Sequence, residues 1–412
     1  MDECFLIGEK LSHSFSPQIH NCFGNHSYSL KEISKDNLKD FVLSKEYKGL
    51  NVTIPYKEVI LDYLDVLSPL VQEIKSCNTV VNLQGKLYGY NTDYAGFAYL
   101  IKKNNFEIEN SRVLILGTGG ASKTVAYYLK EKGCQIFFGS RNKTENAYLY
   151  SEIYNLKVDF IINTTPIGMY PNNYQRLIDL KRFNNLKGVI DIIFNPLKTQ
   201  LLVQAEELKI KHCNGFLMLV AQAEEASRLF GFKSSLNIDD VYLDLLSKMK
   251  NIVLIGMPMA GKSRVGKRLA SFIKTEFVDL DDYIQMKEKM SIKEIFINRG
   301  EEYFRKVETK CLKLLANRQG LVIALGGGIV ESEENYNVLK ENCYIVNLLR
   351  NFEQLIYNRR RPLINNQDDY LKLWEKRQGK YEHFADVTFL NQGSITTLCQ
   401  KIWGAFCENI DS

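Results

Sequence analysis

The sequence lacks any apolar run long enough to cross a lipid bilayer, which requires about 20 consecutive apolar residues. Residues 1–8 begin acidic and continue as a strand-like run, so we expect no signal peptide. An excess of one charge is also missing, since the formal net charge is only +5 over 412 residues and the basic residues are scattered. We therefore expect neither a membrane nor a nucleic acid as a partner.

Cysteine pairs of the C-x-x-C type are absent. The nine cysteines are odd in number and spread from Cys4 to Cys407, and the five histidines are equally dispersed. This pattern argues against a disulfide framework and against a zinc site. It favours free thiols in a reducing compartment, so we expect a cytoplasmic protein.

A flexible linker is missing as well. The chain is too long for one ordinary core, so we expect two or three domains, and its 45% hydrophobic and 25% charged residues are typical of globular proteins. Helix-like residues 238–246 are separated from strand-like residues 252–255 only by residues 247–251, which are not rich in Gly, Ser or Pro. We expect two globules that sit close together.

Residues 256–263 read G-x-x-x-x-G-K-S, between the apolar run at 252–255 and a helix-like stretch at 264–270. A strand, a glycine loop and a helix in this order form a phosphate cradle. Backbone N–H groups of the loop, which begins at Gly256 and ends at Gly261, would bind phosphate oxygens. Lys262 would reach the β- and γ-phosphates of ATP, and the Ser263 hydroxyl would bind Mg²⁺.

A second glycine-rich turn suits a dinucleotide. An apolar strand at 112–116 precedes the turn and a helix-like stretch follows it, which is the context of a pyrophosphate site. The predicted contacts of the turn are Gly117, Gly119, Gly120 and Ala121. The next strand ends at Arg141, where a site for NAD would place an acidic residue. A cation matches a 2′-phosphate better, so the sequence favours NADP.

The first hundred residues alternate between strand-like and helix-like segments, which predicts a mostly parallel sheet. Polar clusters interrupt this pattern at S-F-S, N-V-T-I-P-Y-K, N-T and N-T-D. Each alone is compatible with helix capping or turn chemistry. Together and in this order they resemble the substrate domain of shikimate dehydrogenases.

The resemblance implies that the hydroxy-acid ring is held by Ser14, Ser16, Thr53 and Asn78, and that Lys57 and Asp93 form a catalytic pair. Reduction of a ketone by hydride leaves an alkoxide, which a lysine ammonium can stabilise and protonate. A nearby carboxylate would orient that lysine.

The same resemblance continues to about residue 248. It implies cofactor contacts from Asn163 and Thr164, which end a strand, and a substrate contact from Gln222 in a returning helix. Phe194 stands where the family usually has a tyrosine. We expect a substrate domain at 1–100, completed by 215–248, and an NADP-binding Rossmann domain at 101–214.

Residues 251–412 resemble shikimate kinases, which have the nucleoside-monophosphate-kinase fold. The resemblance rests on the glycine loop followed by D-x-D, F-R, G-G-G, R-P-L and K-R in sequence. The motifs that follow the loop contribute Asp279, Asp281, Arg305, Gly327, Gly328, Arg361 and Arg377.

Each of these residues has an implied role. Asp279 would act on Mg²⁺, and Asp281 would hold the accepting hydroxyl and take its proton. The substrate carboxylate would be clamped by Arg305 and Arg377. The paired glycines would let the substrate ring approach the backbone, and Arg361 would close over the phosphates as part of a lid.

Two departures from the kinase pattern concern Met259, where the family commonly has glycine, and a short stretch before Arg361. The sequence as a whole predicts an α/β bifunctional enzyme. It would reduce 3-dehydroshikimate with NADPH and then phosphorylate shikimate with ATP and Mg²⁺. Two alternatives stay open: an NAD-dependent quinate or polyol dehydrogenase, and a binding module with an inactive kinase half. The sequence leaves the oligomeric state open.

Overall fold

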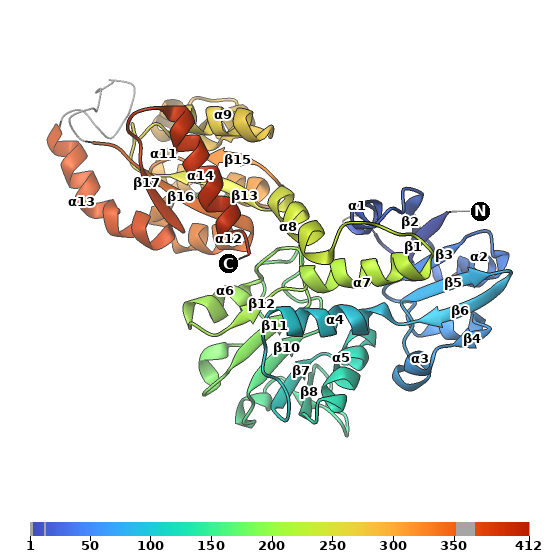
Figure 1. Cartoon of the computed structure of the whole chain (residues 1–412). Coiled ribbons are helices and arrows are strands. Elements are labelled where there is room, and N and C mark those ends of the chain that lie inside the picture. The colour runs from blue at the N-terminus through green and yellow to red at the C-terminus, as the bar shows by residue number, and fades with distance from the viewer. Residues whose placement is uncertain (1–2, 12–13, 352–366, 412) are drawn as a thin grey trace. The chain divides into compact units, whose positions relative to one another are not determined.

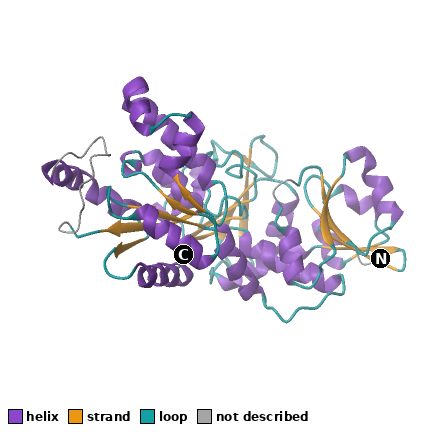
Figure 2. Cartoon of the chain, turned by 90° about the horizontal axis from the view of Figure 1, so that it is seen from above, coloured by secondary structure: helices purple, strands orange, loops and turns teal. Residues whose placement is uncertain are grey.

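The computed structural model describes residues 3–11, 14–351 and 367–411 (Figure 1). The chain forms two compact units, which consist of Met1–Asn195 with Thr199–Tyr242 and of Pro196–Lys198 with Leu243–Ser412. Helices and strands alternate in both units, and Figure 2 shows strands flanked by helices. The predicted α/β class is confirmed. Within the described residues, no helix is both long and apolar enough to cross a membrane.

The first sheet of the first unit has the strand order β2-β1-β3-β5-β6-β4. Its strands are β1 (Cys4–Gly8), β2 (Tyr28–Glu32), β3 (Gly49–Val52), β4 (Val66–Leu67), β5 (Thr79–Leu83) and β6 (Lys86–Tyr90). The pairings β1–β2, β1–β3 and β4–β6 are parallel, whereas β3–β5 and β5–β6 are antiparallel. The hairpin between β5 and β6 was not predicted. Gln84 and Gly85 form its turn, both at positive φ (53° and 80°), as a tight hairpin turn requires.

The second sheet of the first unit has the order β12-β11-β10-β7-β8-β9, and all of its pairings are parallel. Its strands are β7 (Arg112–Leu116), β8 (Gln135–Ser140), β9 (Tyr148–Leu149), β10 (Phe160–Asn163), β11 (Gly188–Asp191) and β12 (His212–Cys213). The strand order reverses at β7, next to which the glycine-rich turn lies. In open parallel sheets this switch point is where nucleotides bind.

The helices of the first unit follow or connect these strands. They are α1 (Ser16–Cys22), α2 (Leu38–Ser44), α3 (Pro69–Ile74), α4 (Thr92–Lys103), α5 (Gly120–Glu131), α6 (Gln200–Glu207) and α7 (Phe216–Leu229), with short 3₁₀ turns at Lys35–Asn37, Val59–Tyr63, Ile153–Asn155 and Leu180–Arg182. Helices α4 and α7 pack closely because α4 has Gly96 at the contact. A Cβ at this position would lie 2.5 Å from the Met218 carbonyl oxygen. This close approach lets the Thr92 hydroxyl of α4 donate to Gln222 Oε1 of α7 over 3.3 Å.

Helix α8 (Ile238–Met249) continues beyond the predicted end at residue 246, and the next strand begins at Asn251. The separation expected at 247–251 is therefore shorter, and only Lys250 lies between the helix and the strand. The sequence 247–249 carries no helix-breaking residue, so the helical pattern extends to Met249.

The second unit has a single five-stranded parallel sheet of order β14-β15-β13-β16-β17. Its strands are β13 (Asn251–Ile255), β14 (Phe277–Asp279), β15 (Val322–Ala324), β16 (Cys343–Leu349) and β17 (Val387–Leu390). The described helices are α9 (Lys262–Ile273), α10 (Leu280–Glu288), α11 (Ile292–Ala316), α12 (Glu333–Asn342), α13 (Gln367–Phe384) and α14 (Ile395–Glu408), with a 3₁₀ turn η5 at Ile329–Glu331.

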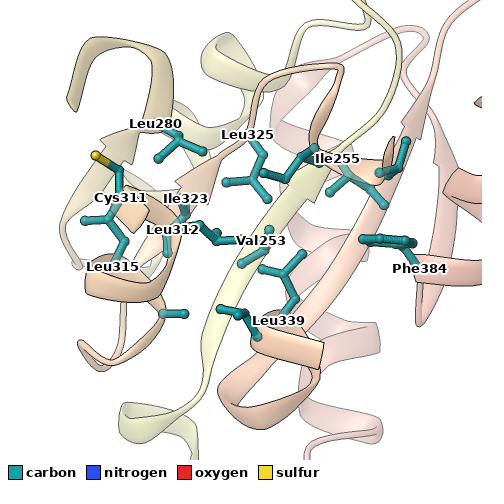
Figure 3. Close-up of a cluster of buried hydrophobic side chains, with 14 of the residues drawn as sticks. Val253, Ile255, Leu280, Cys311, Leu312, Leu315, Ile323, Leu325, Leu339 and Phe384 are labelled. Atoms are coloured by element: carbon teal, nitrogen blue, oxygen red, sulfur yellow. The ribbon is translucent and has the colours of Figure 1, made fainter. Parts of the chain in front are cut away.

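The core of the second unit explains this arrangement. Every residue of β13 is buried, as expected for a central parallel strand that is covered on both faces. Figure 3 shows Val253 and Ile255 of this strand within a cluster that includes Leu312 of α11, Leu339 of α12 and Phe384 of α13. Helix α11 is kinked at Gly300, where φ is 80°, so its second half is a separate segment behind the sheet.

Candidate active sites

The centre of the first site is an ion pair between Lys57 and Asp93. The Lys57 Nζ lies 2.5 Å from Asp93 Oδ2, and both side chains are largely buried. Lys57 comes from the turn after β3. Asp93 lies in the first turn of α4, which Asn91 caps by accepting from the Tyr94 N–H. A carboxylate is stabilised at this end of a helix by the helix dipole.

Asn78 holds the second oxygen of the Asp93 carboxylate. Its Nδ2 donates to Asp93 Oδ1 over 2.9 Å, and its Oδ1 accepts from the Thr92 N–H over 2.7 Å. The Gln222 Oε1 of α7 lies 3.4 Å from the same Nδ2. The structure therefore brings four predicted residues together, namely Lys57, Asp93, Asn78 and Gln222. Thr92 belongs to this network but was not predicted individually.

The predicted serines lie at the start of α1. The Ser14 hydroxyl donates to the Ser16 hydroxyl over 3.1 Å. Between them, the Phe15 ring packs edge-on against Phe194, with ring centroids 5.9 Å apart. Phe194, which replaces the usual tyrosine, therefore packs against the residue between the two serines with a ring that has no hydroxyl.

A buried tyrosine links the serines to Asn78. Burial raises the pKa of Tyr28 well above its usual value, and a hydrogen bond with Ser16 opposes this effect. The Tyr28 hydroxyl donates to Asn51 Oδ1 over 2.8 Å, and Asn51 Nδ2 donates to the Asn78 carbonyl. Thr53, predicted as a further substrate ligand, follows β3 in the same segment and is half-buried. Tyr28 was missed as a supporting residue because nothing local in the sequence marks it, and Asn51 was missed although it begins the N-V-T-I-P-Y-K cluster.

The glycine-rich turn after β7 fits a dinucleotide. Gly117 has φ 106°, which favours glycine, and a Cβ there would lie 2.9 Å from Thr164 Oγ1. Gly119 begins α5 without a side-chain cap, and a Cβ there would have no described atom within 4 Å. The first N–H groups of α5, including that of Ala121, are thus left for an anion. A Cβ at Gly120 would lie 3.6 Å from Lys57 Cβ, so the turn lies directly beside the ion pair.

Asn163 is placed differently from a simple cofactor ligand. Its side chain is buried, its Nδ2 donates to Asp191 Oδ1 over 3.0 Å, and its Oδ1 accepts from the Thr165 hydroxyl and N–H. The side chain thus faces the protein interior, and its predicted cofactor contact stays a prediction. The neighbouring Thr164 hydroxyl donates to the Leu116 carbonyl, which holds this loop against the glycine-rich turn.

Asp191, at the end of β11, was not predicted. It is fully buried and accepts from Asn163, from the Thr199 hydroxyl over 2.7 Å and from the Ile193 N–H. Burial raises its pKa to about 7, although these hydrogen bonds oppose the shift. An acid directly after an apolar strand is the only sequence signal for it.

Arg141 is exposed just after β8, at the position where the ribose of a dinucleotide is expected. The nearby Lys143 is paired with Glu152, with 2.8 Å between Nζ and Oε1. This cation is thus neutralised by its own loop. Arg141 remains the predicted partner of a 2′-phosphate.

The phosphate loop of the second unit is built on left-handed backbone. Gly256 and Gly261 have φ 137° and 93°, and a Cβ would lie 2.4 Å from the Leu348 carbonyl oxygen at the first and 2.5 Å from Asn391 Nδ2 at the second. Met259 also has a positive φ, 69°. Kinases of this family commonly have glycine at this position, and glycine adopts a positive φ more easily than methionine does. The backbone at Met259 is therefore strained.

The two polar side chains predicted to meet the nucleotide and its metal ion are bonded to neighbouring protein groups in this structure. The buried Lys262 donates from Nζ to the carbonyls of Gly256 and Met257, over 2.8 and 3.0 Å, so it lies along its own loop. The Ser263 hydroxyl donates to Asp279 Oδ2 over 2.6 Å. A hydroxyl and a carboxylate in contact at the end of a phosphate loop match the oxygen ligands and bound water that Mg²⁺ prefers.

The predicted acceptor side of the second unit gathers around residues 326–328. A Cβ on Gly328 would lie 2.3 Å from Arg305 Nη1, so the guanidinium lies against this glycine. A Cβ on Gly326 would lie 2.9 Å from Asp281 Oδ1. The Tyr381 hydroxyl of α13 donates to the Gly327 carbonyl over 2.6 Å.

Glu308 lies at the centre of this group and was not singled out from the sequence. Its Oε2 accepts from Arg305 Nη1 over 2.6 Å, and its Oε1 has no partner among the described residues. Burial raises its pKa; the charges of Arg305 and Arg377 oppose this shift and that of Asp281 adds to it. These effects show that all four side chains share one neighbourhood. The signal that could have revealed Glu308 is its place one helical turn after Arg305. The predicted lid residue Arg361 and the short stretch before it lie outside the described residues.

Comparisons with known proteins agree with this geometry. Residues 6–80 match the family model "Shikimate dehydrogenase substrate binding domain", and residues 258–406 match "Shikimate kinase". A shikimate dehydrogenase (NADP⁺) of Clostridium beijerinckii is 40% identical over 243 residues, which is 55% of this chain and 90% of that protein. The chain belongs to the shikimate dehydrogenase family. Its second unit carries a shikimate kinase domain.

Solved structures support the same assignment. Shikimate dehydrogenase 1 from Peptoclostridium difficile has a TM-score of 0.56 and 36% identity, with 60% of this chain and 98% of that chain covered. A chorismate mutase/shikimate 5-dehydrogenase fusion protein from Clostridium acetobutylicum has a TM-score of 0.55 and 34% identity, with 59% and 97% covered. The predicted fusion of dehydrogenase and kinase, with NADP, ATP and Mg²⁺ as its cofactors, is confirmed.

Proposed function

We propose that the two halves of this shikimate dehydrogenase–kinase catalyse consecutive steps through the residues described above. Lys57 is the proton donor of the reduction of 3-dehydroshikimate. Asp281 is the base that accepts the proton of the shikimate hydroxyl in the phosphorylation. The observation that carries the proposal is the Lys57–Asp93 pair, which lies directly beside the glycine-rich turn of the dinucleotide domain.

In the reduction, NADPH supplies the hydride when bound. As the carbonyl carbon gains the hydride, negative charge develops on its oxygen, and the Lys57 ammonium stabilises this charge and donates a proton to it. Asp93 keeps the lysine in place, and Asn78 keeps Asp93 in place through the other carboxylate oxygen. Ser14, Ser16, Thr53 and Gln222 hold the substrate.

In the phosphorylation, Mg·ATP supplies the phosphoryl group when bound. Ser263 and Asp279, which are in contact, would hold the metal ion, and Lys262 would bind the phosphates. Arg305 and Arg377 bind the substrate carboxylate, which leaves its hydroxyl near Asp281.

We assign the substrate domain to residues 1–100 and 215–248, the NADP-binding domain to 101–214 and the kinase domain to 251–412. We also propose that the reactions occur in the cytoplasm on small-molecule substrates. All nine cysteines are free thiols, as a reducing compartment would leave them.

The test uses the purified full chain with 3-dehydroshikimate, NADPH and Mg·ATP. We expect NADPH oxidation followed by ADP release, and ADP release from Mg·ATP alone only after shikimate is added. NADPH oxidation without shikimate-dependent ADP release would favour the alternative of an inactive kinase half. A preference for NAD over NADP would favour the alternative of a quinate or polyol dehydrogenase.

A further inference from the structure

The carboxylate of Glu331 meets three cations of one helix. Glu331 ends the 3₁₀ turn η5, shortly after the glycines at 326–328. Its Oε1 accepts from Arg377 Nε over 2.7 Å and lies 3.4 Å from Lys376 Nζ, and its Oε2 accepts from Lys380 Nζ over 2.6 Å. All three cations belong to α13. One acid of the loop therefore holds a cluster of positive charges on the helix that carries a predicted substrate ligand.

The pairing with Arg377 is the most buried of these contacts. The Arg377 side chain is only 5% exposed, whereas those of Lys376 and Lys380 are 64% and 42% exposed. A buried guanidinium is strongly disfavoured without a partner charge. Burial tends to raise the pKa of Glu331, but hydrogen bonds from Lys380 and Arg377 and their charges outweigh it and lower the pKa to about 2. Glu331 is thus ionised at neutral pH.

A second contact joins the same face of α13 to the segment 326–331, which contains the three consecutive glycines. Residues 376, 377, 380 and 381 lie on one side of α13, as the helical repeat requires. Tyr381, also on this face, donates to the Gly327 carbonyl from a fully buried position. The charge of Arg377 acts on Glu308, as does that of Arg305. The position of Arg377 is therefore set by its bond to Glu331 and by the Tyr381 bond that ties α13 to Gly327.

Glu331 occupies only one donor of the guanidinium, and the Tyr381 hydroxyl also interacts with the Arg377 side chain. Glu331 accepts from Nε, which carries one of the five N–H donors of an arginine. The other four donors are on the two terminal nitrogens, which suit the two oxygens of a carboxylate.

We propose that Glu331 is a positioning residue of the kinase half, which fixes the Arg377 guanidinium so that its terminal nitrogens meet the substrate carboxylate. This inference rests on the proposed role of Arg377 in substrate binding. It adds a residue outside the kinase motifs of the sequence. It also implies that α13 is held in place by its contacts with residues 327 and 331.

The test replaces Glu331 in the full chain by glutamine, which keeps its size but not its charge. We expect the KM for shikimate in the kinase reaction to rise ~10-fold or more, because a displaced clamp binds the carboxylate poorly. The KM for ATP should change little. Glu331→Asp should restore part of the affinity, since it restores the charge.

Two matched controls separate this role from a general loss of charge. Glu333→Gln removes an acid that also faces α13, but through an exposed contact of 3.5 Å with His383. Lys380→Met removes the other close partner of Glu331 and leaves its contact with Arg377. Both should leave the KM for shikimate within about 3-fold of the original, since rim ion pairs contribute little. The dehydrogenase activity of the same chain reports that each variant is intact elsewhere.

Three results would be decisive. An unchanged KM for shikimate in Glu331→Gln, with a raised KM in Arg377→Lys, would overturn the role of Glu331 and leave that of Arg377 in place. An unchanged KM in Arg377→Lys as well would overturn the substrate-binding role of Arg377, and this inference with it. Equal increases in the KM for ATP and for shikimate, with a lower unfolding midpoint in Glu331→Gln and no rescue by Glu331→Asp, would show a purely structural role.

Discussion

The two glycine-rich loops of this chain follow a strand and begin a helix in the same way, but they are built differently. The loop after β7 has one left-handed residue, Gly117, and leaves the start of α5 open beside Gly119. The loop after β13 has three left-handed residues, and its glycines are in close contact with the backbone of β16 and with Asn391. The first loop therefore offers a helix end to a phosphate, whereas the second encloses its ligand with a fixed backbone.

The lysines beside the two loops differ in which part of the chain they come from. Lys57 belongs to another sheet and reaches the dinucleotide turn through tertiary structure, where Asp93 holds it. Lys262 belongs to the phosphate loop itself and is held by the loop carbonyls. The dehydrogenase site is thus assembled from distant segments, and the nucleotide cradle of the kinase from a single one.

The largest expected effect separates the two lysines. Lys57→Met should lower the rate of 3-dehydroshikimate reduction by about 10²–10⁴-fold, because the proton donor is lost, and should leave the kinase rate unchanged. Lys262→Met should do the reverse. Steady-state assays of both reactions on each variant check this. A loss of both activities in either variant would contradict the separate construction of the two sites.

The next effect compares the glycines. Gly256→Ala should destabilise the kinase half by about 1–3 kcal/mol and abolish ADP release, because its Cβ would collide with the Leu348 carbonyl and φ is 137°. Gly119→Ala should leave stability unchanged and raise only the KM for NADPH. Both tryptophans, Trp374 and Trp403, lie in the second unit, so tryptophan fluorescence during urea unfolding measures its stability. Equal unfolding midpoints for Gly256→Ala and the original chain would refute the comparison.

A pH effect on the stability of the dehydrogenase half should come from Asp191. The pKa of Asp191 is about 7 in the folded chain because of burial, against 3.8 for the usual group. Between these values the folded state keeps a proton that the unfolded state has lost. The free energy of unfolding should therefore fall as pH rises from about 4 to 7, and Asp191→Asn should lack this contribution.

The measurement for Asp191 is the urea midpoint of dehydrogenase inactivation at several pH values, because the first unit contains no tryptophan. The pH profile of kinase unfolding, followed by fluorescence, serves as the internal control, because it should be the same in the original chain and in Asp191→Asn. The same slope in the original chain and in Asp191→Asn would show that Asp191 is already ionised in the folded protein.

The smallest effect is expected at Met259. Met259→Gly removes a left-handed residue that costs about 1 kcal/mol, but it also removes a partly buried side chain that packs on the core. We expect these changes to offset each other to within about 1 kcal/mol, and the KM for ATP to change less than about 5-fold. A loss of several kcal/mol would show that the methionine side chain, and not the loop backbone, holds this part of the cradle.

Much of this protein could be read from local patterns. The glycine loops with their flanking strand and helix, the D-x-D pair and the polar clusters of the first sheet each lie within a few residues of one another. Local backbone chemistry dictates their geometry, as with the positive φ of Gly256 and Gly261 in the phosphate loop. Lys57 and Asp93 are far apart in the sequence. They were predicted as a pair because the motifs around them resemble those of shikimate dehydrogenases.

Other features depended on the tertiary structure because their meaning comes from burial and from partners distant in sequence. The β5–β6 hairpin, the length of α8, the inward-facing Asn163 and the buried acids Asp191 and Glu308 have only weak local signals in the sequence. Glu331 is an ordinary acid in the sequence. It becomes the partner of Arg377 only when α13 packs against the 3₁₀ turn η5. The sequence by itself determined which chemical groups this enzyme has, and the fold decided which of them are buried, paired and aimed at a substrate, because desolvation and charge pairing exist only once the chain is packed.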